Sequence, residues 1–154
     1  MNDPILIIDL EPDPESLQAP VKPGSPADIL ARTLYGEARG ESVRGKEAVA
    51  CVIMNRVRKP CWWGKSVEEV CRRPWQFSCW NQTDPNCAKI QHVDDSDRVF
   101  RICVRIARRA IAGVLDDPTK GATHYHTRNM LPNWAKALSP CAEIGNHLFY
   151  NDVE

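Results

Sequence analysis

The sequence lacks several features that would point directly to a function. None of its apolar runs approaches the roughly 20 residues that cross a bilayer, so no membrane-spanning helix is expected. No C-x-x-C pair occurs, which disfavours a zinc ribbon or zinc finger. No glycine-rich phosphate loop occurs, which disfavours nucleotide chemistry. No internal repeat is visible, and 154 residues are the length of one ordinary domain.

The beginning of the chain lacks both basic residues and a long apolar stretch. Residues 5–8 are apolar but too few for a secretory signal peptide, so no export signal is expected. Residues 1–21 contain five acidic side chains and no Lys or Arg, and six of the twelve prolines lie within residues 1–26. This composition predicts an acidic, proline-rich leader over residues 1–25, which could dock a partner, before a domain over residues 26–154.

Net charge is also lacking, because Lys plus Arg and Asp plus Glu number 20 each. The zero hides an asymmetry, since residues 22–154 carry 20 basic and 15 acidic side chains. A mildly basic body suits an anionic polymer, but the same balance is common in proteins that bind none. We expect no nucleic-acid partner.

Cysteine, in contrast, is abundant, and seven is an odd number that leaves at least one thiol without a partner in the chain. Cys51 and Cys103 lie in apolar helical patterns and are expected to be buried free thiols. The four cysteines between residues 61 and 87 crowd a loop-rich stretch, where they are either disulfides or further buried thiols. If they pair, we predict that Cys79 joins Cys87 and that Cys61 joins Cys71.

Helical periodicity dominates the middle of the chain. Ser25 and Pro26 form a capped helix start, and that helix should end near Gly40. Further helices are predicted over residues 43–58, over residues 66–71 after a capping box, and over residues 96–114, the longest. Residues 74–86 should form a loop or a short β excursion.

Two short segments near the C-terminus have the pattern of strands. Residues 122–127 and 144–150 are predicted to pair as a small antiparallel sheet. The fold class that follows is α+β, predominantly α, in a single domain with a small antiparallel β-sheet.

Glu37 is the most unusual side chain in the first helix. It lies roughly 20° from Leu30 around the helix, at the edge of the apolar stripe. Glu rarely occupies such a position unless it is paired or functional. The negative end of the helix should raise its pKa, and a protonated carboxyl is what general acid catalysis requires. The alternative is a structural Glu paired with Arg32 or Arg39.

Glu41 lies one turn beyond Glu37. Paired carboxylates suggest glycoside hydrolysis, but two acids four residues apart on one helix do not readily flank a glycosidic bond. Glu41 is therefore expected to be structural or to position a substrate.

Histidines provide a second kind of chemistry. His124 and His126 alternate in a predicted strand and should face the same side, where His147 or Cys141 could complete a catalytic metal site. The same His-Tyr-His segment can equally line a sugar-binding cleft. The five tryptophans could stack on sugars or fill the core. No local signature selects a nucleophilic Cys for a Cys–His pair.

Five motifs, in order over residues 28–150, resemble those of the SleB-type cell-wall hydrolases, the spore-cortex-lytic family. They read ARTLYGEARGE (31–41), GKEAVACVIMNRV (45–57), QFS (76–78), GATHY (121–125) and IGNHLFY (144–150). The resemblance implies a lysozyme-like, lytic-transglycosylase-like fold that cuts the glycan strands of peptidoglycan, without a metal or another cofactor.

The resemblance also assigns site residues. It puts the catalytic acid on Glu37 and the active-site hydroxyl on Thr123. The substrate-binding residues that it implies are Tyr35, Glu41, Gln76, Phe77, Tyr125 and His147. No clear second acid appears in the motifs, so the expected reaction is intramolecular and leaves a 1,6-anhydro-muramic end. The alternatives are a metal-dependent amidase or peptidase using His124 and His126, or a catalytically silent wall-binding module.

Three features differ from the spore enzymes that the motifs resemble. No export signal and no separate wall-binding domain are visible, and residues 61–87 are rich in cysteine. These features suggest a phage or prophage lysin, or a virion-associated enzyme. It would be made in the cytoplasm and would act on the cell wall, either in the periplasm or after delivery by a virion.

Overall fold

The computed structural model describes residues 19–154, and most of the predicted leader lies outside them. Five α-helices and three strands follow one another in this part of the chain. They are α1 (Pro26–Ala38), α2 (Val43–Arg58), α3 (Val67–Arg72), α4 (Pro85–His92), α5 (Arg98–Ala112), β1 (His124–Thr127), β2 (Ala142–Ile144) and β3 (His147–Tyr150), with short 3-10 helices η2 (Ser78–Trp80) and η3 (Asn133–Ala135). None of the helices within residues 19–154 is long and apolar enough to cross a membrane.

Side-chain caps fix the predicted helix starts. The hydroxyls of Ser25, Ser42 and Ser66 each accept one hydrogen bond, from the backbone N–H three residues further along the chain. Asp97 caps α5, so that helix begins two residues later than expected and has 15 residues. The prediction that it is the longest helix is wrong, since α2 has 16 residues.

Two elements were not expected from the sequence. Helix α4 begins with the cap Asp84 and with Pro85 in its first turn, but it buries only Cys87 and Ile90. Strand β2 has only three residues and pairs with β3, which also pairs with β1, giving the antiparallel order β1-β3-β2. The predicted antiparallel pairing is confirmed for β1 and β3, with Tyr125 opposite Phe149. The predicted single strand over residues 144–150 is wrong, since a turn separates the end of β2 from the start of β3.

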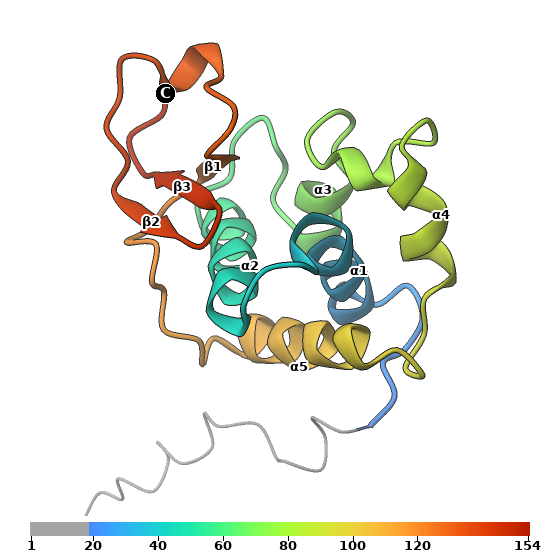
Figure 1. Ribbon diagram of the computed structural model, residues 1–154. Coiled ribbons are helices and arrows are strands. Elements are labelled where there is room, and N and C mark those ends of the chain that lie inside the picture. Colours follow the sequence, from blue (N-terminus) through green and yellow to red (C-terminus); the bar gives the residue numbers. More distant parts are fainter. Residues whose placement is uncertain (1–18) are drawn as a thin grey trace, which may run out of the picture.

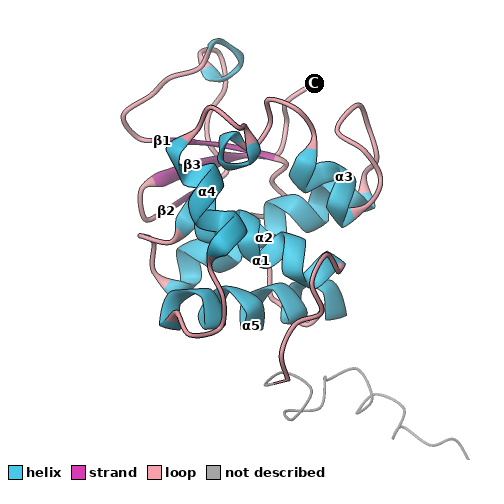
Figure 2. Ribbon diagram, turned by 90° about the vertical axis from the view of Figure 1, so that its right-hand side faces the viewer, coloured by secondary structure: helices cyan, strands magenta, loops and turns pink. Residues whose placement is uncertain are grey.

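The main core forms around α1, which packs against α5, α3, α4 and α2. The sheet packs against α2 through a second, smaller cluster, in which Ala48 and Val52 meet Ala122, Ile144 and Phe149. Helix α5 lies along one side of the molecule and the sheet lies toward the opposite side (Figures 1 and 2). The sheet thereby lies against α2, and Tyr125 of β1 packs against the main core.

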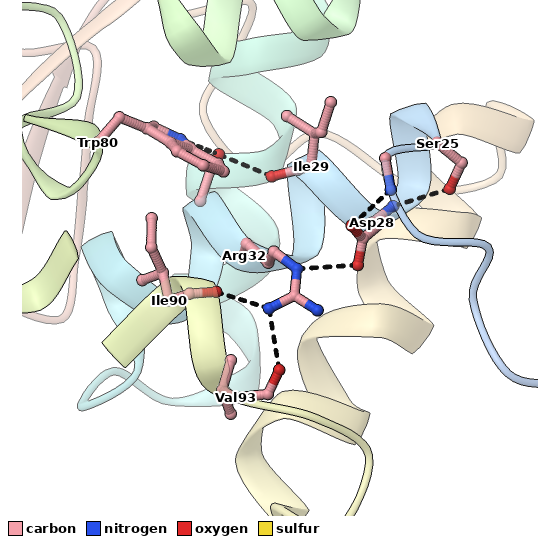
Figure 3. A network of polar contacts seen from close by, with 9 residues as sticks. Ser25, Asp28, Ile29, Arg32, Trp80, Ile90 and Val93 are labelled. Carbon is pink, nitrogen blue, oxygen red and sulfur yellow. Dashed lines mark hydrogen bonds and ion pairs between the residues drawn. The ribbon is translucent and has the colours of Figure 1, made fainter. Parts of the chain in front are cut away.

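A polar network holds the N-terminal half of α1 in place (Figure 3). Arg32 donates to Asp28 Oδ1 at 3.0 Å and to the carbonyl oxygens of Ile90 and Val93 at 2.6 and 2.9 Å. Trp80 Nε1 donates to the Thr33 hydroxyl at 2.9 Å. Because these bonds connect α1 to the end of α4 and to η2, they fix the helix that carries Glu37.

All seven cysteines lie in the described part of the chain and are free thiols. Cys51 and Cys103 are buried, as predicted. The predicted disulfides are wrong. Cys79 packs directly on Gly36 of α1, while Cys87 Sγ faces the Trp80 carbonyl oxygen at 3.6 Å. Cys61 is exposed whereas Cys71 is fully buried, so neither pair is in bonding position.

Candidate functional site

Glu37 and Tyr125 meet although 88 positions separate them in the sequence. Glu37 is the last but one residue of α1, and Tyr125 lies in β1. The Tyr125 hydroxyl donates a hydrogen bond to Glu37 Oε1 at 2.9 Å. Gly36 gives Cys79 close access to α1, because a Cβ there would overlap the Cys79 side chain. The half-buried carboxyl group therefore lies between α1, β1 and η2.

The Glu37 carboxyl is held in a state that suits an acid catalyst. Burial raises its pKa, while hydrogen bonds from Tyr125 and Cys79 oppose part of this rise. The direction agrees with the sequence prediction, although burial rather than the helix end is the largest cause. Within residues 19–154 Glu37 forms no ion pair, because Arg32 pairs with Asp28 and Arg39 donates to Asn86 Oδ1. The alternative of a structural ion pair is therefore wrong.

Tyr125 serves as a neutral donor to this carboxyl. Burial and the nearby Glu37 raise the pKa of its hydroxyl well above the ordinary value, so it keeps its proton at physiological pH. Its ring packs edge-on against His147, with 4.8 Å between the ring centroids, and lies 5.8 Å from the Phe149 ring. These contacts fix the direction in which the hydroxyl points.

Thr123 lies immediately before β1 and is buried. Its backbone N–H donates to the Tyr150 carbonyl at 3.0 Å, which extends the pairing with β3. Because side chains alternate along an extended chain, Thr123 lies on the same face as Tyr125, the face that meets Glu37. Its Oγ1 is 2.9 Å from Nδ1 of His124, whose pKa burial and the charge of Arg56 lower to about 4. That imidazole is neutral at pH 7.

Arg56 of α2 connects several of the sequence motifs, and it is a site residue that was not predicted from the sequence. Its Nε donates to the Thr123 carbonyl at 2.7 Å and its Nη1 to Gln76 Oε1 at 3.3 Å. The guanidinium lies over the rings of Trp63 and Phe77, 5.1 and 5.7 Å from their centroids. The sequence signal that could have identified it is a basic residue on the apolar stripe of the predicted helix over residues 43–58. Gln76 and Phe77 are thus brought to Arg56, and Phe77 is only 3% exposed.

Glu41 and His147 are brought together beside the β2–β3 turn. Glu41 Oε1 accepts a hydrogen bond from the Asn146 backbone N–H at 3.0 Å and lies 3.9 Å from His147 Nδ1. Burial lowers the pKa of His147, and the charge of Glu41 opposes that shift. The structure therefore gives Glu41 the contacts of a residue that holds the turn.

Tyr35 is not brought to Glu37. Residues two positions apart on a helix are separated by about 200° around its axis, so the side chains of Tyr35 and Glu37 point in nearly opposite directions. The Tyr35 hydroxyl donates to Asp97 Oδ2 at 2.9 Å, and its ring meets the Phe100 ring of α5 edge-on at 6.2 Å. The structure gives Tyr35 a packing role at the α1–α5 interface.

The histidines of β1 face one side, as predicted, since both rings pack on Trp134. They are nevertheless engaged, because His126 Nε2 lies 2.8 Å from the Tyr150 hydroxyl and His126 Nδ1 lies 2.7 Å from the Thr127 carbonyl. In the described part of the chain, no three His, Cys, Asp or Glu side chains gather in a way that could hold a metal ion. The metal-dependent alternative therefore has no ligand set here.

Comparison with known proteins gives the same family at the level of sequence. The profile of the Cell Wall Hydrolase family matches residues 40–150. The spore cortex-lytic enzyme of Halalkalibacterium halodurans is 32% identical over 126 residues, which are 80% of this chain and 34% of that protein. The spore cortex-lytic enzyme of Bacillus subtilis is 29% identical over 124 residues, 79% of this chain and 36% of that protein. The chain thus spans about a third of the length of these relatives.

Solved structures give the same result for the fold. The catalytic domain of the germination-specific lytic transglycosylase SleB from Bacillus anthracis superposes with a TM-score of 0.64 at 28% identity, covering 84% of this chain and 98% of that domain. The catalytic domain of the Bacillus cereus SleB protein gives a TM-score of 0.62 at 30% identity, covering 84% and 94%. The predicted lysozyme-like fold is confirmed, and the chain belongs to the cell wall hydrolase family, with SleB-type catalytic domains as structural neighbours.

Proposed function

We propose that this domain cleaves the glycan strands of peptidoglycan as a lytic transglycosylase, with Glu37 as general acid and then general base. The observation that carries the proposal is the Glu37 carboxyl, which is partly buried, has no cationic partner within residues 19–154 and is held by the Tyr125 hydroxyl. A carboxyl whose pKa is raised can donate its proton near neutral pH. Membership of the cell wall hydrolase family supports the choice of substrate.

The proposed reaction needs only one acid. Protonated Glu37 donates its proton to the glycosidic oxygen as the bond to the muramic acid C1 breaks. The resulting carboxylate then accepts the proton of that sugar's own 6-hydroxyl, whose oxygen forms the new bond to C1. The product carries a 1,6-anhydro ring, and Glu37 returns to its protonated form. Thr123 orients the sugar from the strand that faces the acid.

Two candidates for a second carboxylate, Glu41 and Asp84, are engaged with the backbone, which favours this mechanism over hydrolysis. A hydrolase would need a second carboxylate about 5–9 Å from the first. Glu41 accepts from the Asn146 backbone, and Asp84 Oδ1 accepts from the Asn86 backbone at the start of α4. Both are therefore engaged in holding the chain.

The test is the Glu37→Gln variant on purified peptidoglycan. We expect the rate of turbidity loss to fall on the order of 10²–10⁴-fold, since Gln cannot donate a proton. Glu68→Gln on α3, a carboxyl for which the structure shows no hydrogen bond within residues 19–154, is the matched control and should lyse normally. Mass spectrometry of the wild-type products should find anhydro-muramic ends. Reducing ends would overturn the transglycosylase mechanism alone, and full activity in Glu37→Gln would overturn both parts of the proposal.

The biological setting is a separate proposal. We propose a phage or prophage lysin, or a virion-associated enzyme, that is made in the cytoplasm and acts on the cell wall. Lysis that requires a co-produced membrane-permeabilising protein would support this role. Lysis after cytoplasmic production alone would contradict it.

A further inference from the structure

A row of aromatic rings leads away from the candidate site. The Trp63 ring lies 5.8 Å from that of His124, which lies 5.2 Å from that of Trp134. At the other end of the row, Trp62 stacks edge-on against Trp63 at 5.5 Å. Trp63 is only 5% exposed whereas Trp62 is 50% exposed, so the row runs from a buried anchor to an open ring.

A cavity of about 430 Å³ opens beside the exposed end of this row. Its walls include Trp62, Trp63, Gly64, Arg72 and Arg73. This volume lies within the range of roughly 300–1,000 Å³ that small-molecule sites occupy. Gly64 has φ +111°, and a Cβ there would overlap Glu69, so this loop is closed tightly against α3. The cavity is therefore a built feature of the loop between α2 and α3.

The rim of the cavity carries positive charge. Arg72 and Arg73 are exposed, and neither forms an ion pair within residues 19–154. The acid of the cavity wall, Glu69, accepts a hydrogen bond from the Lys65 backbone N–H at 2.9 Å. The Arg72 guanidinium lies over the Trp80 ring, 5.1 Å from its centroid, so its nitrogens stay open to an anion while its face is packed. An open indole ring beside two guanidinium groups without a carboxylate partner suits a ligand that combines an apolar ring face with a carboxylate.

We propose that this cavity is a second saccharide subsite, which binds a muramic-acid unit of the glycan strand away from the bond that is cleaved. The sugar ring stacks on Trp62, and the carboxylate of its lactyl group or stem peptide pairs with Arg72 or Arg73. The inference rests on the proposed function for the identity of the ligand.

Hydrogen bonds connect the subsite to Thr123, the residue immediately before β1. Trp63 Nε1 donates to the Arg56 carbonyl at 3.0 Å, and Arg56 Nε donates to the Thr123 carbonyl. A glycan strand bound at Trp62 is thus held at a fixed position relative to Thr123. Binding there adds affinity for long strands, and its loss raises KM more than it lowers kcat.

The experiment measures binding without cleavage. Proteins carrying Glu37→Gln are sedimented with purified insoluble peptidoglycan. Adding Trp62→Ala should weaken binding about tenfold, which corresponds to about 1.4 kcal/mol. Trp62→Phe keeps a ring and should restore most of the affinity. Trp75→Ala is the matched control, since Trp75 is 81% exposed but lies outside the cavity walls. It should change binding by less than about twofold if adsorption to walls is specific.

The arginines are tested with a second probe. Changing Arg72 and Arg73 together to Gln should weaken binding to peptidoglycan but not to chitotetraose, an amino-sugar oligomer without carboxylates. Unchanged binding of Trp62→Ala, or an equal loss in Trp75→Ala, would overturn the subsite, with circular dichroism verifying the fold of each variant. If Glu37→Gln stops lysis while Trp62→Ala binds normally, only the subsite is wrong. If Glu37→Gln lyses normally while Trp62→Ala binds weakly, only the proposed function is wrong.

Discussion

Replacing Glu41 with Ala should destabilise the fold through the β2–β3 turn. The carboxylate accepts the Asn146 N–H at 3.0 Å, and its side chain is 16% exposed. Two glycines make room for it, because a Cβ at Gly45 or at Gly145 would overlap Glu41 atoms. Gly145 also has φ +56°, which a residue with a side chain adopts at a cost. The turn is thus shaped around this one side chain.

The magnitude follows from the single charged hydrogen bond. A hydrogen bond to a charged group contributes about 1.5–3 kcal/mol to the free energy of unfolding. One kcal/mol lowers Tm by about 2–4 °C in a domain of this size, so Glu41→Ala should lower Tm by about 3–12 °C. Glu41→Gln keeps an acceptor oxygen and should lose less.

The assay is thermal unfolding at pH 7 followed by circular dichroism. Glu68→Ala on α3 is the control for the loss of a carboxyl on a helix. If Glu41→Ala unfolds at the wild-type temperature and loses only activity, the carboxylate serves the substrate, as the family resemblance implied, and the structural reasoning is refuted.

Two further predictions concern the acid itself. Tyr125→Phe removes a hydrogen bond that favours the ionised carboxyl, so the pKa of Glu37 should rise further. The alkaline limb of the pH–activity profile should then move to higher pH. A limb that stays in place or moves to lower pH would contradict this prediction. Because burial raises the folded-state pKa of Glu37 above its unfolded value, the stability that its proton provides is lost as pH rises through the folded-state pKa. The Tm of Glu37→Gln minus the Tm of wild type should therefore increase as the pH rises from acid to neutral. A difference that does not change with pH would show that the pKa of Glu37 is not raised on folding.

Local signals in the sequence were sufficient for most of the helices. Helix α2 has the bounds that its pattern predicts, because its Ser42 cap and its apolar stripe are both encoded within the segment. Helix α4 has an equally good start at Asp84 and Pro85, but two buried residues do not make a visible stripe. Strand β2 exists because β3 supplies its hydrogen-bond partners. A three-residue segment carries too little sequence pattern to predict such a pairing.

The site was predictable where a residue conflicted with its surroundings. Glu37 lies beside apolar positions, and that conflict predicted that it is either paired or functional. The motif did not predict which face of the helix each of its residues occupies. Tyr35 was assigned to the site because it lies in the same motif as Glu37, although helix geometry puts the two side chains on different faces. Cysteine spacing failed for a similar reason, because Cys79 is fixed by its contact with Gly36 rather than by its distance along the chain from Cys87.

Arg56 is a buried cation that holds the strand facing Glu37 and forms no ion pair with Glu37 in the described residues. Its guanidinium donates to the Thr123 carbonyl and to the Gln76 side chain, which are both neutral. A carboxylate partner would have been neutralised as an ion pair, and its pKa would have fallen. Because Arg56 uses its hydrogen bonds on neutral oxygens, it fixes the strand that faces Glu37 without stabilising the ionised form of that carboxyl by direct contact. Burial and the charge of Arg56 lower the pKa of His124 to about 4, whereas burial raises the pKa of Glu37. The two shifts favour a neutral imidazole and a protonated carboxyl.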